Sequence, residues 1–313
     1  MYGGKIMAQM YFYKFNINAE IYNVYKDETL QEKILNQVFE KLDSDMTYEY
    51  GFEEDEQDKM IEYKFCDLLK SSEDLAITGR LVKIYDGEVE SYDRKNDTVT
   101  QVYEEDRAAS ATFYFDILNE EIAFITRQGF GYLQFGTYFV KLLEQKFPEG
   151  SFALILEKNI GELKSKLYAM NRVLKVTCAM IPPNANEAEF TTLLGASVDE
   201  FKETGATKYV QSMEIPAKGK NSIKVKTRFF NRLLYALGKG YADMVVEGRN
   251  KNNEKITLNS DEDAPYKLPI PESEKDSISA FREHGKCNLS ILLKDKALIQ
   301  MQDNGEVNGD KEE

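Results

Sequence analysis

The sequence is poor in the residues that carry most protein chemistry. Its 313 residues include one histidine, three cysteines and no tryptophan. A single histidine excludes sites that need two imidazoles, such as the zinc-protease helix motif and most zinc sites made only of protein ligands. Cys66, Cys178 and Cys287 are odd in number and far apart, which favours free thiols in a reducing cytoplasm over disulfides, redox pairs or iron–sulfur ligands.

Long hydrophobic runs are missing as well. The longest stretch without a charged residue, 128–140, has 13 residues, whereas a membrane-spanning helix needs roughly 17–25 apolar residues. The first residues do not combine a basic segment, an apolar run and a small-residue cleavage site, so they do not resemble a secretory signal. With 42% hydrophobic and 12% aromatic residues, the chain is expected to bury a core. We predict a soluble, cytoplasmic protein that does not contact membranes.

Few motifs suggest catalysis. The glycines of the segment RQGFGYLQFG lack the spacing of a phosphate-binding loop and favour a strand-to-helix turn over a nucleotide site. His284 is expected in an exposed loop before a strand, as a solvated side chain rather than a general base. Asp243 and Glu247 would share one face of a strand and could hold Mg²⁺, which keeps a metal-dependent nuclease as an alternative. We assign no catalytic or metal-ligating residue and expect no cofactor.

The pattern of apolar residues predicts an α+β fold, with an N-terminal antiparallel sheet flanked by helices and a C-terminal mixed α/β lobe. The alternation in QMYFYKFNI predicts a first strand. Asp27 is suited to cap the helix that follows, whose apolar side chains recur at helical spacing. Further strands are expected at 60–68, 75–85, 98–105, 109–118 and 120–126, and a helix at 137–146.

After residue 150 strands and helices alternate. We expect helices at 160–170, 187–194, 197–204 and 222–239, and strands at 151–158, 173–181, 207–214 and 241–248. Residues 250–285 are polar and are predicted to form a long loop or peripheral lobe, followed by strands in CNLSILLK and ALIQM that close the sheet. The predicted domains are an acidic α+β domain at 1–150, an α/β lobe at 151–300 and a disordered tail at 301–313.

Charge is divided unevenly along the chain. The net charge is -14, and residues 1–150 hold 16 basic and 30 acidic side chains, whereas residues 201–250 hold 10 basic and 4 acidic ones. The first half is therefore acidic and the later segment is locally basic. A negative total does not exclude a polyanionic partner for the basic segment. The acidic half could imitate nucleic acid or bind a basic partner, but dispersed solubilising charge explains it more simply.

The basic segment is predicted to form one amphipathic helix at 222–239. At about 100° per residue, its cations fall on one side, opposite an apolar stripe between Phe229 and Leu237. The flanking loop AKGKN adds two lysines. Such a line of cations suits contacts to a phosphate backbone, and a tyrosine could stack on a base; an ordinary solvated helix face is the alternative. The candidate nucleic-acid-binding residues are Lys218, Lys220, Lys224, Arg228, Arg232, Tyr235 and Lys239.

The order of elements in the middle of the chain resembles a known group. The strands of ATFYFDILNEEIAFITR, a glycine-bearing turn, the helix FGTYFVKLLEQKF, the strand SFALILEK, the helix IGELKSKL and the strand VLKVTCAMIPPN follow one another. This order is similar to that in bacterial and phage-encoded proteins of the RexA (lambda exclusion) and KwaB (Kiwa defence) type and related domains of unknown function. The resemblance covers roughly residues 105–250 and carries no residue-by-residue motif.

The resemblance implies a cytoplasmic antiphage-defence or prophage-exclusion factor that binds DNA without sequence preference and self-associates, for example as a homodimer. The expected function is therefore nucleic-acid binding through phosphate contacts, with DNA as the expected partner. Two alternatives stay open. One is a protein-interaction subunit of a defence complex, whose acidic lobe binds a partner or mimics DNA, and the other is the metal-dependent nuclease.

Overall fold

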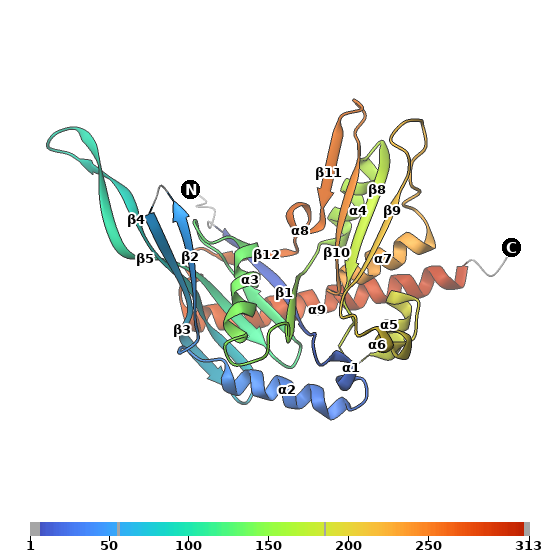
Figure 1. Cartoon of the computed structure of the whole chain (residues 1–313), viewed down its shortest axis with the longest axis horizontal. Helices are drawn as coiled ribbons and strands as arrows, with labels where there is room; N and C mark the ends of the chain where they lie inside the picture. Colours follow the sequence, from blue (N-terminus) through green and yellow to red (C-terminus); the bar gives the residue numbers. More distant parts are fainter. Residues whose placement is uncertain (1–6, 55–56, 185, 310–313) are drawn as a thin grey trace, which may run out of the picture.

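The computed structural model describes residues 7–54, 57–184 and 186–309 and has the α+β architecture that the sequence predicts (Figure 1). Within these residues, antiparallel pairing joins the strands into two sheets, of eight and four strands. The strands are β1 (Met7–Ile17), β2 (Thr47–Glu54), β3 (Gln57–Ser71), β4 (Ala76–Asp93), β5 (Thr98–Asp116), β6 (Glu121–Phe124), β7 (Phe152–Leu156), β8 (Arg172–Met180), β9 (Tyr209–Glu214), β10 (Ala242–Arg249), β11 (Lys255–Asn259) and β12 (Lys267–Pro271).

The helices connect the strands and cover the sheets. Two of the predicted short helices are found almost where the sequence placed them, because Asn186 and Ser197 cap their first turns through side-chain hydrogen bonds. The helices are α1 (Ile21–Val24), α2 (Glu28–Lys41), α3 (Tyr132–Leu143), α4 (Ile160–Ala169), α5 (Glu187–Leu194), α6 (Val198–Thr204), α7 (Arg228–Gly238), α8 (Ser260–Asp263) and α9 (Ile278–Gly309).

The first sheet is a curled antiparallel sheet in the order β12-β1-β6-β5-β4-β3-β2. Its β1 has β6 on one side and, on the other, β12 along its first half and β7 along its second half. Strand β5 is one continuous strand where the sequence suggested two separate strands, since its pairing with β4 continues past a bulge between Tyr85 and Gly87. The predicted meander is confirmed from β3 to β6, and β2 adds a strand that the sequence analysis did not anticipate.

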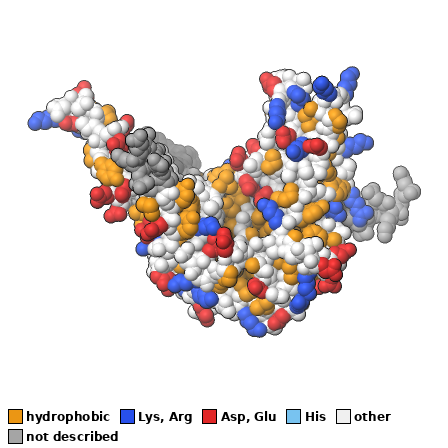
Figure 2. Space-filling model, in the orientation of Figure 1, with side chains coloured by type: hydrophobic (Ala, Val, Ile, Leu, Met, Phe, Trp, Pro, Cys, Tyr) orange, Lys and Arg blue, Asp and Glu red, His pale blue; other side chains and the backbone are white. Residues whose placement is uncertain are grey.

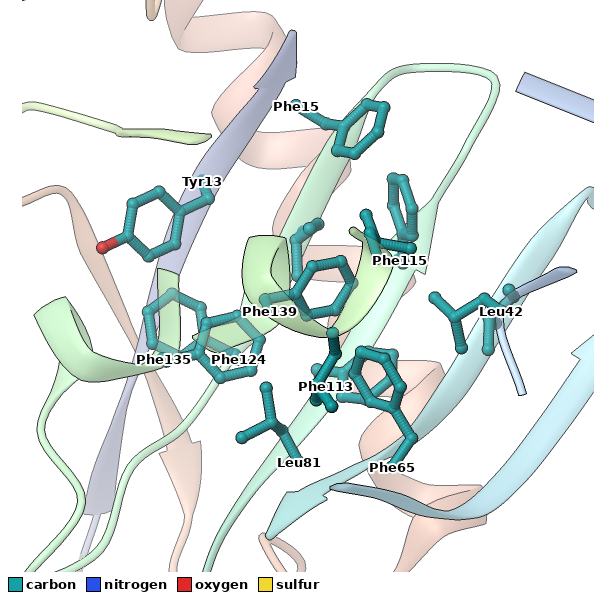
Figure 3. Close-up of a cluster of buried hydrophobic side chains, with 14 of the residues drawn as sticks. Tyr13, Phe15, Leu42, Phe65, Leu81, Phe113, Phe115, Phe124, Phe135 and Phe139 are labelled. Carbon is teal, nitrogen blue, oxygen red and sulfur yellow. The ribbon is translucent and has the colours of Figure 1, made fainter. Parts of the chain in front are cut away.

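Aromatic side chains fill the concave side of this sheet beneath α2 and α3 (Figure 3). The rings of Phe124 and Phe135 stack with centroids 4.1 Å apart, and Phe139 contacts Phe113 edge-on at 5.5 Å. Gly136 of α3 is part of this packing, because a Cβ there would lie 2.6 Å from the ring of Tyr13. The glycine segment 129–136 therefore serves a strand-to-helix connection and close packing, as expected.

The second sheet has the order β11-β10-β8-β9. Every second side chain of β10, and of β8 from Val176 onward, is buried, among them Val176, Met180 and Met244, and these pack against α4 and α7. The alternate side chains are half-buried or exposed. This alternation is typical of an antiparallel sheet with one covered face.

The longest helix, α9, joins the two sheets, and here the sequence prediction was wrong. Residues 250–285 are not a loop but contain β11, α8, β12 and the start of α9, and the segment CNLSILLK is helical rather than a closing strand. Phe281, Leu289 and Leu292 pack on the outer face of the first sheet, whereas Ile299 packs beside α7. The helix therefore runs from one sheet to the other (Figure 1).

The predicted domain boundary at residue 150 does not separate the sheets. β7 and β12, which follow it, pair with β1 in the first sheet. The structure describes part of the segment 301–313, which was predicted to be a disordered tail. In the structure α9 continues through this segment as far as Gly309, and residues 310–313 lie outside the described residues. None of the helices in the described residues combines the length and the hydrophobicity that spanning a bilayer requires.

Candidate nucleic-acid interface

The predicted basic helix is shorter than expected. It begins at Arg228, because the side chain of Thr227 accepts a hydrogen bond from the backbone N–H of Phe230 at 3.2 Å and caps the helix. Residues 222–223 instead bond to β8: the N–H of Ile223 donates to the carbonyl of Val173 at 2.9 Å. Lys224 therefore lies before the helix and not on it.

The cationic side of α7 is not an open line of charge. The Tyr235 side chain is 9% exposed, and its hydroxyl donates a hydrogen bond to the Glu189 carboxylate. Lys239 lies 3.6 Å from the same carboxylate, with its side chain 15% exposed. The guanidinium of Arg232 lies over the ring of Phe229, 5.0 Å from its centroid. The prediction that Arg232, Tyr235 and Lys239 form an exposed line was wrong, because α5 brings Glu189 onto that side of the helix.

The apolar side of α7 is placed as predicted. Phe230, Leu233, Leu234 and Leu237 are buried against the second sheet, and Phe229 packs at the edge of the same cluster. Burial of this stripe, together with the contact between α7 and α9, gives the helix a structural role.

Of the remaining predicted cations, Lys218, Lys220 and Lys224 belong to an exposed loop, and Arg228 is the first residue of α7. Residues 215–228 contain five Lys or Arg and no Asp or Glu. Lys218, Lys220, Lys224 and Arg228 are all exposed. The loop is attached to the start of β8 by the hydrogen bond from the Ile215 N–H to the Leu174 carbonyl and by the Arg172 side chain, which donates to the Asn221 carbonyl at 3.0 Å.

The register of the second sheet adds cations to this loop. Arg249 at the end of β10 is opposite Arg172 on one side and opposite Lys255 on the other. This row is possible because residue 248 is glycine: a Cβ there would lie 2.3 Å from the Arg172 carbonyl oxygen. We call the resulting surface the basic tip and define it as Arg172, Lys175, Lys218, Lys220, Lys224, Arg249, Lys251 and Lys255.

The basic tip keeps an excess of positive charge after its own ion pairs are counted. Glu247 pairs with Lys255 at 3.0 Å, Glu214 is opposite Lys175 in the register, and Glu254 lies in the turn between β10 and β11. Three carboxylates therefore face the eight cations of the tip. Lys and Arg side chains gather at the free end of the second sheet in Figure 2.

An aromatic side chain borders this surface. Tyr168, near the end of α4, is 41% exposed, and the Nζ of Lys226 lies 4.8 Å from its ring centroid. The chain passes from α4 almost directly into Arg172 of the tip. The sequence indicated Tyr235 as the ring available for stacking, but the structure buries that ring and exposes Tyr168 instead.

The carboxylates of the nuclease alternative are far apart and already paired. Asp243 and Glu247 point to the same side of β10 but are four residues apart, roughly 13 Å at about 3.3 Å per residue. Asp243 accepts a hydrogen bond from Lys158 at 2.5 Å, and Glu247 pairs with Lys255. No group of three or more His, Cys, Asp or Glu in the part of the chain that the structure describes has metal-binding geometry. His284 lies on α9, not in a loop, beside Glu274.

A buried cluster of charges, which the sequence analysis did not anticipate, lies where the two sheets meet. Lys296 of α9 pairs with Glu121 at 2.7 Å and with Glu157 at 2.6 Å, and Lys14 pairs with Glu120 at 2.9 Å. Burial raises the pKa of Glu121 to about 7, against the opposing effect of Lys296. The signal in the sequence was a charged residue within an otherwise apolar strand, such as Lys14 in YFYKFNI.

A cavity of about 300 Å³ opens beside this cluster, between α4, α7 and α9. Two of its lining lysines already have carboxylate partners, Lys158 with Asp261 at 2.9 Å and Lys296 with the two glutamates. These two lysines are thus compensated within the protein. Lys158 also pairs with Asp243 of β10 at 2.5 Å, so together with the cluster it links α9 and the first sheet to the second sheet, and we call these ion pairs the buried joint.

These features define an α+β protein with a curled antiparallel sheet and a second sheet that ends in a basic surface. The chain belongs to the family of the domain of unknown function DUF4747, whose sequence profile matches residues 8–286. The match includes both sheets and the first part of α9. No curated protein shows significant similarity to the chain.

Proposed function

We propose that this protein binds nucleic acid, with DNA as the primary partner, through phosphate contacts made by the basic tip. The observation that carries the proposal is the sheet register, which collects Arg172, Arg249 and Lys255 on three adjacent strands beside a loop with four lysines. Cations that replace condensed counterions supply sequence-independent affinity for a phosphate backbone. Tyr168 offers a ring on which an unpaired base could stack.

We further propose that this binding serves antiphage defence or prophage exclusion in the bacterial cytoplasm. The support is the resemblance in element order to RexA- and KwaB-type proteins. The resembling region, residues 105–250, includes β8, β9, β10 and the loop that carries Lys218 and Lys220. Binding without base recognition suits a factor that must respond to foreign DNA of many sequences.

The test is fluorescence anisotropy of labelled double-stranded DNA at about 50 and 200 mM salt, where phosphate-dominated binding weakens most. The variant Lys218→Glu/Lys220→Glu/Lys251→Glu changes three exposed tip residues. We expect its Kd at the lower salt to rise at least about tenfold and its salt dependence to become shallower by roughly 0.9 per lost phosphate contact.

The matched control reverses three exposed lysines near α2, as Lys26→Glu/Lys33→Glu/Lys41→Glu. It alters the net charge by the same amount, so it separates a local surface from total charge. If both variants lose affinity equally, the tip is not the binding surface, and if the parent protein does not bind at 50 mM salt, the proposed function is wrong. Single-stranded DNA and RNA of equal length show which nucleic acid is preferred.

A further inference from the structure

Strands β4 and β5 extend far beyond the first sheet as a two-stranded arm. Pairing of β3 with β4 ends at Tyr85, whereas β4 and β5 stay paired as far as Asp93 and Thr98. We call residues 86–106 the acidic ribbon. It projects from one end of the molecule (Figure 1), and nearly all its residues are exposed.

The ribbon exposes apolar side chains on both of its faces. Tyr92 is opposite Val99 on one face, and both are 57% exposed. Tyr103, which is 61% exposed, lies on the same face as Val99, and Val89 is opposite Val102 on the other face. An isolated two-stranded ribbon is only marginally stable in water, and its two outer edges present unpaired backbone groups. A ribbon of this kind gains stability when another surface covers it.

The charge of the acidic ribbon indicates which kind of surface would cover it. Residues 86–106 hold eight Asp or Glu and two Lys or Arg, a net charge of -6. The basic tip has the opposite sign, and its loop continues from β9, an edge strand of the second sheet. The tip therefore offers the complementary charge beside the edge of a sheet.

The two surfaces cannot meet within one molecule. The ribbon and the free end of the second sheet stand apart on the two sides of a hollow (Figure 2). A second copy, however, can bring its basic tip to the ribbon of the first. Such a contact joins different surfaces of the two partners, so each added copy leaves one ribbon and one tip available for the next.

We propose that the acidic ribbon of one molecule docks on the basic tip of a second copy, so that the protein assembles head to tail. This contact stands independently of nucleic-acid binding. If both occur, nucleic acid and the ribbon compete for the tip, and assembly regulates access to it. Opposite charges on the two surfaces also make the assembly sensitive to salt.

Charge reversal tests the contact by sedimentation velocity at 5–200 µM, in about 50 and 500 mM salt. The ribbon variant is Glu88→Lys/Glu90→Lys/Glu104→Lys, and the tip variant is Lys218→Glu/Lys220→Glu/Lys251→Glu. We expect the mass of the parent to rise above 36.0 kDa with concentration and to fall back at high salt. Each variant alone stays at the monomer mass, because the ribbon variant has no net charge on its ribbon and the tip variant has lost the positive excess of its tip.

An equimolar mixture of the two variants is the decisive measurement, since the unchanged acidic ribbon of the tip variant can dock on the unchanged basic tip of the ribbon variant. We expect the mixture to form one-to-one pairs, although each variant alone stays monomeric. The control Glu32→Lys/Glu40→Lys/Glu73→Lys changes exposed residues outside the ribbon and should associate like the parent. Circular dichroism verifies that each variant folds.

Three results would overturn the proposal: a parent that stays monomeric at 200 µM in low salt, a ribbon variant that associates like the parent, or a mixture that stays monomeric. A DNA-binding measurement on the ribbon variant distinguishes a failure of assembly from a failure of the proposed nucleic-acid binding. If the ribbon variant binds DNA as tightly as the parent or more tightly while it fails to associate, the two roles of the tip are separated.

Discussion

The helix α7 and the basic tip are both rich in cations, yet the structure uses their charges differently. On α7, Lys239 is 15% exposed beside Glu189, and Arg232 lies over an aromatic ring. On the tip, Lys218, Lys220 and Lys251 are exposed and extend from loops or turns. The cations of a helix that packs on two sides make contacts within the protein, whereas cations at the free end of a sheet stay exposed and can contact a partner.

The largest expected effect is on the stability of the protein through α7. Leu233→Ala removes a fully buried side chain from the second core and should lower the free energy of unfolding by about 2–5 kcal/mol. Urea denaturation measures this change. The control Val210→Ala truncates an exposed side chain and should change stability by less than about 0.5 kcal/mol. Equal losses would mean that α7 is not the structural element described above.

The second prediction concerns the buried joint, whose charges pair only within the protein, and the effect of pH on its contribution to stability. Because burial raises the pKa of Glu121 to about 7, the folded state holds this proton more tightly than the unfolded state does. The stabilising contribution is complete below the ordinary carboxyl pKa, near 4.5, and is lost as pH rises through about 7. The loss amounts to up to about 3 kcal/mol at 1.36 kcal/mol per pH unit.

The variant Glu121→Gln keeps an acceptor for Lys296 but cannot ionise. Its free energy of unfolding, measured by urea denaturation at several values between pH 4.5 and 8, should fall less steeply with pH than that of the parent. Parallel curves for the two proteins would show that Glu121 does not titrate in this range. Glu32→Gln, at an exposed position of α2, is the matched control and should follow the parent.

The contact of Glu189 on α5 with Lys239 on α7 allows a test of whether α7 contributes to DNA binding as the basic tip does. Glu189→Gln removes the charge that faces Lys239 while it leaves an acceptor for the Tyr235 hydroxyl. We expect a loss of about 1–2 kcal/mol in stability and no change in DNA affinity at 50 mM salt. A clear gain in affinity would indicate that the released Lys239 contacts DNA and that α7 contributes to the interface after all.

The smallest expected effect comes from single lysines. Lys220→Ala should raise the Kd for DNA a few-fold and reduce the slope of log K against log salt by about 0.9, whereas Lys239→Ala should leave both unchanged. Neither quantity depends on how stable the protein is, provided that both variants are folded at the temperature of the binding measurement. The reverse order of effects would return the binding surface to α7.

Local patterns in the sequence predicted much of the fold. Alternation predicted β1, and the side chain of Asp27 accepts a hydrogen bond from Thr29 N at the start of α2, as expected for a cap. The apolar stripe of α7 is buried as predicted. The start of that helix was misplaced because nothing in the residues 222–227 reveals that they bond to β8.

The helix α9 shows where local patterns fail. Its apolar residues serve two different surfaces, since Phe281 and Leu292 face the first sheet and Ile299 lies beside α7. The apolar residues of this helix therefore do not form one continuous stripe, so the helical periodicity in the sequence is weak. Short apolar runs within the helix were for this reason predicted to be strands. Lys296, also on α9, pairs with carboxylates of β6 and of the residue after β7, which are distant from it in the sequence.

The sequence by itself determined the α+β class, most strands and helices, and the contrast between an acidic first half and a basic later segment. These properties depend on side-chain periodicity, capping and composition, which act over a few residues. Only the tertiary structure decided which cations are available. Glu189 reaches α7 through the packing of α5, and Arg172, Arg249 and Lys255 become neighbours through strand register. Both depend on contacts between segments far apart in the chain, and no local pattern encodes them.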